Sequence, residues 1–162
     1  MPDTDTDTDT DTNDAEMQEM KSGEIDDFLN ETGDGVIAFS KDGQPYSVPI
    51  SIGYTDNKIY LKFGYRDGSK KKKYLEANKN VSVTTYETTE DTKSTSVLYD
   101  VAWRSVVVQG TLHEVEDPEA IDAALETHPS DADNPWGLPR AEVEFEVYRL
   151  EIDEITGRKA GM

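Results

Sequence analysis

From residue 35 onward, apolar residues recur at every second position in segment after segment, and this period limits the fold more than any other feature. The clearest segment is residues 141–152, where Val143, Phe145 and Val147 alternate with glutamates. Successive side chains of a β-strand point to opposite sides, so this alternation is typical of a strand with one buried face. The sequence therefore predicts a protein built mainly from β-sheet.

The same reading predicts six strands, mostly antiparallel and joined by short polar turns. They lie at residues 35–40, 45–54, 58–63, 81–87, 97–115 and 141–152. Pro49 has no amide hydrogen, so we expect an edge, a bulge or a break at that point of the second strand. Because closure removes exposed strand edges, we predict a mainly β fold with short helices, closed as a small six-stranded antiparallel barrel.

Three helices are predicted to precede or interrupt these strands, at residues 14–33, 69–77 and 117–126. Gly23 divides the first helix, and Ser22 is expected to cap its second piece. Ser69 is the predicted N-cap of the second helix. Asp117 is the N-cap of the third, with proline at its first helical position.

The chain is strongly acidic, with 35 Asp and Glu against 16 Lys and Arg and a formal net charge of -19. Residues 1–14 repeat Asp-Thr without apolar periodicity, which predicts a disordered acidic tail before one domain at 15–162. A duplex-binding protein needs a basic face, so the charge argues against nucleic acid as a partner. Two explanations of the acidity remain open, a halophilic protein kept soluble in high salt and an ordinary acidic protein with an acidic tail.

Other site classes are excluded by composition. The absence of cysteine rules out disulfides, thiol nucleophiles and thiolate metal sites, and two histidines make a His-rich metal site a poor fit. No long apolar run or signal-peptide core is present, so we expect no membrane span and a cytoplasmic location.

Four consecutive lysines at residues 70–73, which we call the lysine run, stand out in this acidic chain. Adjacent like charges repel one another, and a nearby anion would relieve the repulsion. The run begins a predicted helix, whose N-terminus offers free amide donors, and Gly64 and Gly68 allow close backbone approach. Two interpretations stay open from the residues alone, a phosphate site and a solvated helix face.

Three segments carry a resemblance to a known family. They are GQPYSVPISIGYTDNKIYLKF at residues 43–63, GSKKKKYL at 68–75 and WRSVVVQGTLHEVED at 103–117. In order and spacing they resemble the pyridoxamine 5'-phosphate oxidase-like split-barrel flavoproteins, over residues 24–116 and more loosely to Gly161. The resemblance implies a split β-barrel homodimer that binds two FMN molecules between its protomers.

The resemblance also implies which residues contact FMN. Ser69, Lys70 and Lys71 match the segment that holds the phosphate, whereas Lys72 and Lys73 are expected to be solvated. The remaining cofactor-binding positions that it implies are Val48, Pro49, Ile50 and Ser51 along the flavin ring, Phe63 at the strand end, and Arg104 and Ser105. Gly64, which follows Phe63, is a candidate because it allows close backbone approach. Two further candidates follow from placement, Arg66 as a second cation for the phosphate and Trp103 as a stacking or core aromatic.

The implied activity is an FMN-dependent oxidoreductase of unknown substrate and unassigned catalytic residues. No Rossmann fingerprint is present, so a nicotinamide donor would bind only transiently over the flavin. The C-terminal EITGRKAGM lacks the arginine-histidine substrate signature of the vitamin oxidases, so oxidation of pyridoxamine phosphate is not implied. The alternative is a flavin- or haem-binding module without turnover, serving as a sensor, a store or a stress protein.

Overall fold

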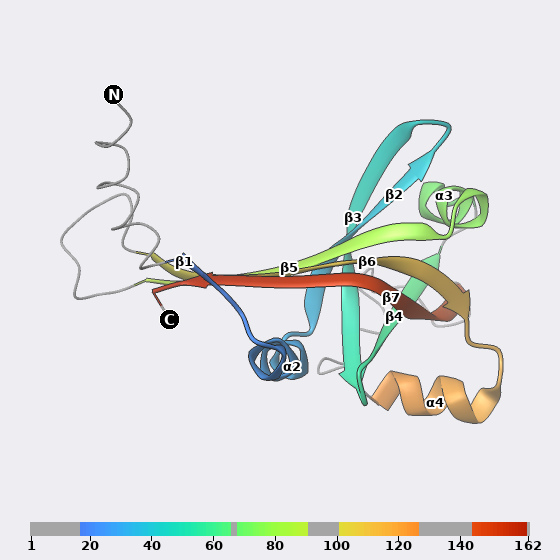
Figure 1. The fold of residues 1–162 in the computed structure, drawn as a ribbon. Coiled ribbons are helices and arrows are strands. Elements are labelled where there is room, and N and C mark those ends of the chain that lie inside the picture. The colour runs from blue at the N-terminus through green and yellow to red at the C-terminus, as the bar shows by residue number, and fades with distance from the viewer. Residues whose placement is uncertain (1–16, 66–67, 91–100, 127–143, 162) are drawn as a thin grey trace.

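A computed structural model describes residues 17–65, 68–90, 101–126 and 144–161. Its strands form one antiparallel sheet in the order β1-β7-β4-β3-β2-β5-β6 (Figure 1). The strands are β1 (Met17–Glu19), β2 (Asp34–Lys41), β3 (Gln44–Thr55), β4 (Lys58–Tyr65), β5 (Asn80–Glu90), β6 (Val101–Glu114) and β7 (Glu144–Ala160). The helices are α2 (Ser22–Glu31), α3 (Lys70–Ala77) and α4 (Pro118–Glu126).

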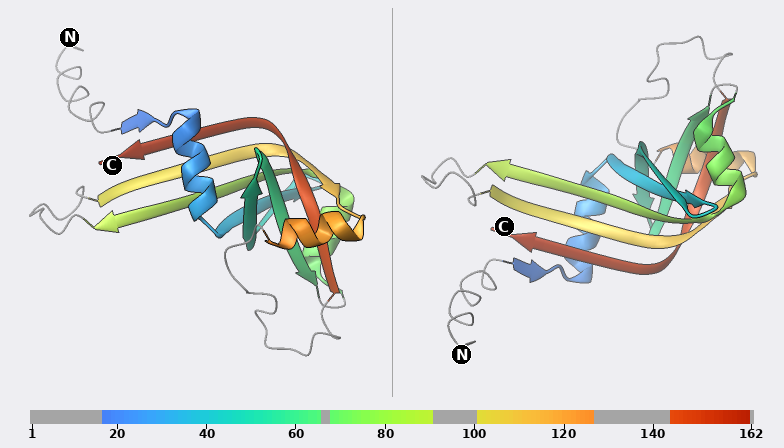
Figure 2. Two further views of the ribbon diagram at one scale, coloured as in Figure 1. Left: turned by 90° about the horizontal axis from the view of Figure 1, so that it is seen from below. Right: turned by 90° about the horizontal axis from the view of Figure 1, so that it is seen from above.

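A further pairing between β7 and β6 closes the strands from β2 to β7 into a ring, which confirms the prediction of a mainly β, barrel-like fold. The far halves of β5, β6 and β7 run beyond this ring as a sheet extension, to which β1 adds through β7. Helix α2 crosses one side of the extension, while α3 and α4 lie at the other end of the molecule (Figures 1 and 2).

Several local predictions are confirmed. Asp42 and Gly43 join β2 to β3 with φ values of 51° and 78°, as a two-residue hairpin turn requires. Ser69 caps α3 by accepting a hydrogen bond from the amide of Lys72. The carboxylate of Asp117 accepts one from the amide of Ala120 at 3.1 Å at the start of α4.

Pro49 lies where one side of β3 has no strand partner among the described residues. It pairs with Val36 of β2, but β4 joins β3 only from Ser51 onward. The expected edge is therefore present, and the missing amide of Pro49 interrupts no ladder.

The first helix was predicted wrongly at its start. Met17–Glu19 forms β1, which pairs with the last residues of β7, and the helix begins at Ser22 with Lys21 as its N-cap. The edge of β7 recruits this segment, because the amide of Met20 also donates to the carbonyl of Gly157 at 2.8 Å. Strand β7 itself continues to Ala160, well beyond the predicted end at 152.

Closure of the barrel brings β6 and β7 unusually close at Gly110. A Cβ at this position would lie 2.0 Å from the carbonyl oxygen of Glu151, so only glycine fits without a backbone shift. The ladder between the two strands is irregular at the step from Gln109 to Gly110. Inside the ring, Ile37, Leu61 and Val106 are fully buried and form part of one apolar core.

Among the described residues, no helix is long and apolar enough to cross a membrane. The acidic tail predicted at residues 1–14 lies outside the described part of the chain.

Candidate functional site

Helix α3 begins five residues after the end of β4, and the lysine run forms its first turn. Ser69 ends the preceding loop as the N-cap, and its hydroxyl accepts from the Lys72 amide while keeping its own proton to donate. The first amides of a helix have no partner within the helix, and they carry the positive end of its dipole. This turn therefore concentrates hydrogen-bond donors and positive charge.

Aromatic rings hold Lys70 in place. Its ammonium lies 4.6 Å from the centre of the Tyr46 ring and 5.7 Å from that of Tyr74. The two rings are themselves 5.0 Å apart, one from β3 and one from α3. A cation over an aromatic face is attracted by the negative face of the ring's quadrupole, so Lys70 is oriented before any ligand arrives.

Lys71 and Lys72 both reach the ring of Tyr65, with their ammonium groups 5.8 Å and 5.4 Å from its centre. The prediction that Lys72 is a solvated neighbour is therefore wrong, because its side chain is half-buried on this ring. Burial lowers the pKa of Lys71, since desolvation disfavours the charged form. An anion beside Lys71 would oppose that shift. Lys73 is exposed, as expected.

The strand segment predicted to run along the flavin ring pairs with β2 on one side, and on the other side it has no described strand partner before Ser51, where β4 joins. Ile50 is buried and Val48 packs against the core, whereas Pro49 is exposed and Ser51 is half-buried. Only the backbone and the side chains on one face of this segment are accessible. That arrangement fits a ligand held mainly through backbone groups, as the resemblance implies.

The residues at the end of β4 divide into two groups. Phe63 has no exposed surface and stacks with Tyr65, their ring centres 6.2 Å apart, so it supports the site from the core and does not face a ligand. Gly64 is the penultimate residue of β4 and is half-buried. Arg66 lies outside the described residues.

Arg104 does not share a face with its neighbours Trp103 and Ser105. Its guanidinium binds the carboxylates of Glu31 and Glu87 at 2.8 Å and 2.6 Å, and lies over the ring of Phe28 under α2. Burial opposes the charge of Arg104, but these two carboxylates outweigh it and raise its pKa. The predicted contact of Arg104 with flavin is therefore not supported, because both carboxylates already engage it.

Trp103 and Ser105 point to the side of the sheet extension opposite α2, which we call the outer face. Their neighbours there include Tyr86, which pairs with Ser105 across β5 and β6. Along β5 this pair lies about 20 Å from Asn80, just after α3, at ~3.3 Å per strand residue. Within one protomer, Ser105 is therefore distant from the C-terminal end of α3, and α3 lies at the opposite end of the molecule from α2 and the extension (Figure 1).

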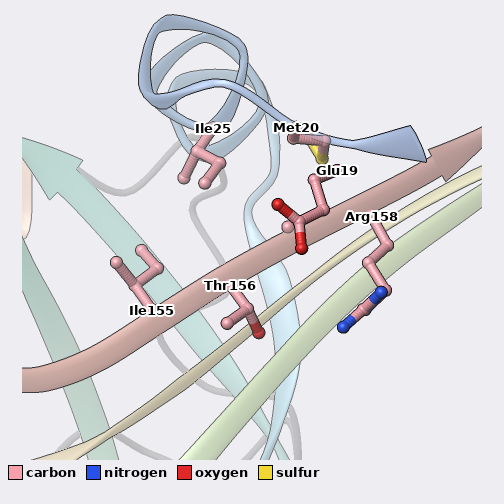
Figure 3. A pocket seen from close by; sticks show the side chains of 7 residues that line it. Glu19, Met20, Ile25, Ile155, Thr156 and Arg158 are labelled. Carbon is pink, nitrogen blue, oxygen red and sulfur yellow. The ribbon is translucent and has the colours of Figure 1, made fainter.

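A small pocket of about 130 Å³ lies between β1, α2 and β7 (Figure 3). It is lined by Glu19, Met20, Ile25, Ile155, Thr156, Gly157 and Arg158. Binding sites for drug-sized molecules are typically about 300–1,000 Å³, so this pocket is too small for a flavin. It also lies at the α2 end of the molecule, away from the lysine run.

A family model described as pyridoxamine 5'-phosphate oxidase matches residues 21–159. The chain belongs to the pyridoxamine 5'-phosphate oxidase family. No curated protein sequence matches it.

Solved structures agree with this membership. A FAD-binding protein from Mesorhizobium loti is 27% identical, with a TM-score of 0.67 over 90% of this chain and 99% of that one. The FAD binding protein from Mycobacterium smegmatis is 20% identical, with a TM-score of 0.62 over 88% and 98%. The FAD and heme binding protein from the same organism is 18% identical, with a TM-score of 0.63 over 91% and 74%. The last two show the fold alone, which is the split barrel of this family.

Three tyrosines of the candidate site in this member of the pyridoxamine 5'-phosphate oxidase family were not predicted from the sequence. Tyr46, Tyr65 and Tyr74 place the ammonium groups of Lys70, Lys71 and Lys72. Nothing in the sequence pattern shows that β3 and β4 bring aromatic rings beside the lysines. Among the described residues, no group of three metal-ligating side chains is assembled.

Acidic side chains gather where β6 ends beside β7. Burial, together with the carboxylates of Glu146 and Glu116, raises the pKa of Glu114 above its usual 4.5. The unfolded chain then loses this proton first as the pH rises, so Glu114 lowers the stability of the fold above that pKa.

Replacing Glu114 by glutamine should therefore raise the melting temperature at pH 7 and low salt. We expect a gain of about 1–2 °C, small because the side chain is largely solvent-exposed. Thermal unfolding followed by circular dichroism at pH 7 and pH 4 measures it, and the gain should shrink at pH 4. Glu119→Gln on α4 removes the same charge elsewhere, and an equal gain there would contradict a local effect of Glu114.

Proposed function

We propose that this chain binds a flavin nucleotide whose phosphate sits at the N-terminus of α3. The observation that carries the proposal is the first turn of α3, where tyrosine rings orient Lys70, Lys71 and Lys72. An ammonium beside free helix amides is a favourable environment for a phosphate. Membership of the family and a 27% identical FAD-binding protein support the same ligand class.

FMN is the flavin we propose, in keeping with the resemblance of the sequence. FMN and FAD both present a phosphate next to the ribityl chain, so the lysine run suits either, and the identity of the released cofactor distinguishes them. Ser69 and the α3 amides would bind the phosphate, and the β3 segment from Val48 to Ser51 would line the ring with the side that β4 leaves open up to Ile50.

The site is proposed to be completed by a second copy of the chain. Ser105 is a cofactor-binding residue by resemblance and Trp103 is a candidate by placement, yet the Tyr86–Ser105 pair lies about 20 Å along β5 from Asn80 and the C-terminal end of α3, at ~3.3 Å per residue. A homodimer would bring this end of one protomer to the lysine run of the other. Both groups of residues would then contact the same cofactor.

The activity we propose is that of a flavin-dependent oxidoreductase. A bound flavin supplies hydride and electron transfer, whereas the protein supplies binding, orientation and electrostatics. The lysine run would fix the phosphate end and so set the position of the ring. A nicotinamide donor is the proposed reductant, bound over the ring without a site of its own.

A second candidate is a cofactor-binding module without turnover. It is favoured by the fold shared with the FAD and heme binding protein from Mycobacterium smegmatis. The lysines and tyrosine rings at the start of α3 suit a phosphate, so flavin remains the first proposal.

The absorption spectrum of the purified protein tests the cofactor. A band near 450 nm, with FMN or FAD identified by mass after denaturation, is the expected result. Bleaching of that band by NADH or NADPH without oxygen would support the oxidoreductase, and a flavin that stays oxidised would favour the module. A colourless protein that does not bind added FMN or FAD would reject flavin binding.

A further inference from the structure

Lys62 of β4 is the one charged side chain that is buried among the described residues, with 8% of its surface exposed. Thr85, the other buried polar residue of this part of the chain, is accounted for by the hydrogen bond that its hydroxyl donates to the carbonyl of Asp34 at 2.8 Å. Lysine is rarely buried to this extent, because burial takes water away from the ammonium. A charge kept in such a place calls for a reason in the structure.

Strand alternation turns Lys62 to the outside of the barrel. Its neighbours Leu61 and Phe63 have no exposed surface and belong to the core, and successive side chains of a strand point to opposite sides. Directly opposite Lys62 in the two ladders are Ser51 of β3 and Val147 of β7. Residues opposite each other in an antiparallel ladder share a side. Lys62 therefore lies on the same side of the sheet as Ser51, which is proposed to line the flavin ring.

The ammonium of Lys62 lies near the end of β4 that leads to the lysine run. It is 6.0 Å from the centre of the ring of Phe145, which pairs directly with Gly64. Strand β4 ends at Tyr65, ~10 Å beyond Lys62 at ~3.3 Å per residue, and it runs toward α3 (Figure 1). Lys62 thus lies between the segment proposed for the ring and the helix start proposed for the phosphate.

Reduction of a flavin creates a charge that a cation in this place would stabilise. A hydride brings one proton and two electrons from a nicotinamide donor, which is oxidised, and it leaves one negative charge on the ring unless a second proton follows. A fixed ammonium stabilises such a charge more strongly in a buried site than in water, because the local dielectric is lower.

We propose that Lys62 is a further flavin-binding residue, whose ammonium lies at the ring and stabilises the negative charge that the ring gains on reduction. Lys62 then favours the reduced flavin over the oxidised one and raises the reduction potential of the bound cofactor, one of the properties that a protein sets by placing charge near the ring. This inference rests on the proposed function, because it assigns a role within the same site.

The reduction potential of bound FMN measures this preference directly. For a two-electron couple, each tenfold difference in affinity between the reduced and the oxidised form shifts the potential by about 30 mV. Lys62→Met removes the charge and keeps an unbranched side chain. We expect it to lower the relative affinity for reduced FMN by about tenfold, and so the potential by about 30 mV. Lys62→Arg keeps the charge and should keep the potential.

Stepwise anaerobic reduction of the FMN-loaded proteins beside a reference dye gives these potentials. Lys58→Met is the matched control, because Lys58 is exposed and begins the same strand, ~13 Å from Lys62 at ~3.3 Å per residue. It removes an equal charge and should leave the potential unchanged. Circular dichroism checks that each variant is folded, and Lys62→Gln, which is also neutral, takes the place of Lys62→Met if that variant does not fold.

The outcomes separate a role at the ring from a structural one. A residue that only supports the fold weakens binding of oxidised and reduced FMN alike, so an unchanged potential in Lys62→Met would overturn the proposal. An equal shift in Lys58→Met would overturn it as well, since the effect would then be one of net charge.

Riboflavin distinguishes the ring from the phosphate. The same shift is expected with riboflavin, whereas a shift seen with FMN alone would place Lys62 at the phosphate and reject the contact with the ring. A wild-type protein that binds neither flavin would reject the proposed function, and this inference with it. Bound FMN whose potential does not depend on Lys62 would reject this inference alone.

Discussion

Replacing Lys70 and Lys71 together by alanine should weaken FMN binding by about a thousandfold. A charge-assisted contact to phosphate contributes about 2 kcal/mol, and each 1.4 kcal/mol is a factor of ten in affinity. Both ammonium groups are held near tyrosine rings at the start of α3, so little side-chain freedom has to be lost on binding. Titration with FMN, followed by quenching of flavin fluorescence, measures the change.

Riboflavin gives the sharpest control, because it has the same ring without a phosphate. Its affinity should be similar for the wild-type protein and the double variant. Lys73→Ala, at an exposed position of the same helix, loses one positive charge and should weaken FMN binding by less than about threefold, as a distant screened charge does. Equal losses for FMN and riboflavin would show that the lysines support the fold and do not hold the phosphate.

Gly110→Ala should destabilise the protein by about 3 kcal/mol, as overpacking at a site without space does. The added methyl group would meet the backbone oxygen of Glu151 at 2.0 Å and the side chain of Leu150 at 3.1 Å. The closest atom belongs to the backbone of β7, so it cannot swing aside. At about 2–4 °C per kcal/mol for a chain of this size, the melting temperature should fall by roughly 6–12 °C.

Gly23→Ala is the matched control for that variant. Nothing lies within 4 Å of a Cβ at this position in α2. Alanine is the better helix former, so stability should stay the same or rise by up to about 1 kcal/mol. A melting temperature of Gly110→Ala within 2 °C of wild type would mean that β6 and β7 do not approach as the structure describes.

The barrel was predictable because the alternation of apolar and polar residues along each strand shows which face of that strand is buried. Residues of β2 and β3 alternate along the chain, and Asp42 with Gly43 marks the turn between them, so the hairpin could be read locally. The starts of α3 and α4 were predictable from nearby residues too, since Ser69 and Asp117 cap these helices with their own side chains. In each case the signal and the structure that it produces lie within a few residues of each other.

Elements that depend on a distant partner were not predictable. Residues 17–19 have no strand pattern of their own, and they become β1 because β7 offers an edge beside Arg158 and Ala160. The end of β7 is polar because Lys159 pairs with Glu24 of α2, which hides the usual alternation. Neither the β1–β7 pairing nor the Lys159–Glu24 ion pair can be predicted from the residues of one segment alone.

The candidate site shows the same division. The position of Ser69 and the lysines at a helix start was evident in the sequence. The rings of Tyr46 and Tyr65 beneath those lysines were not, because two separate strands supply them. Arg104 was assigned to the flavin by resemblance, and its engagement by Glu31 and Glu87 depends on how α2 crosses the sheet.

Strand β7 has a consequence for how this protein reaches its native state. It is the last strand in the described chain, yet it pairs with β6 along most of its 17 residues, with β4 at its start and with β1 at its end. The ring cannot close until β7 has been synthesised, so before that point in translation the earlier strands can form only an open sheet. Pairings between segments so far apart slow folding, because the entropy of closing a long loop is lost before the contacts form. The rate of folding should therefore be limited by the docking of β7, and substitutions that weaken its pairing should delay completion of the barrel more than those in the β2–β3 hairpin.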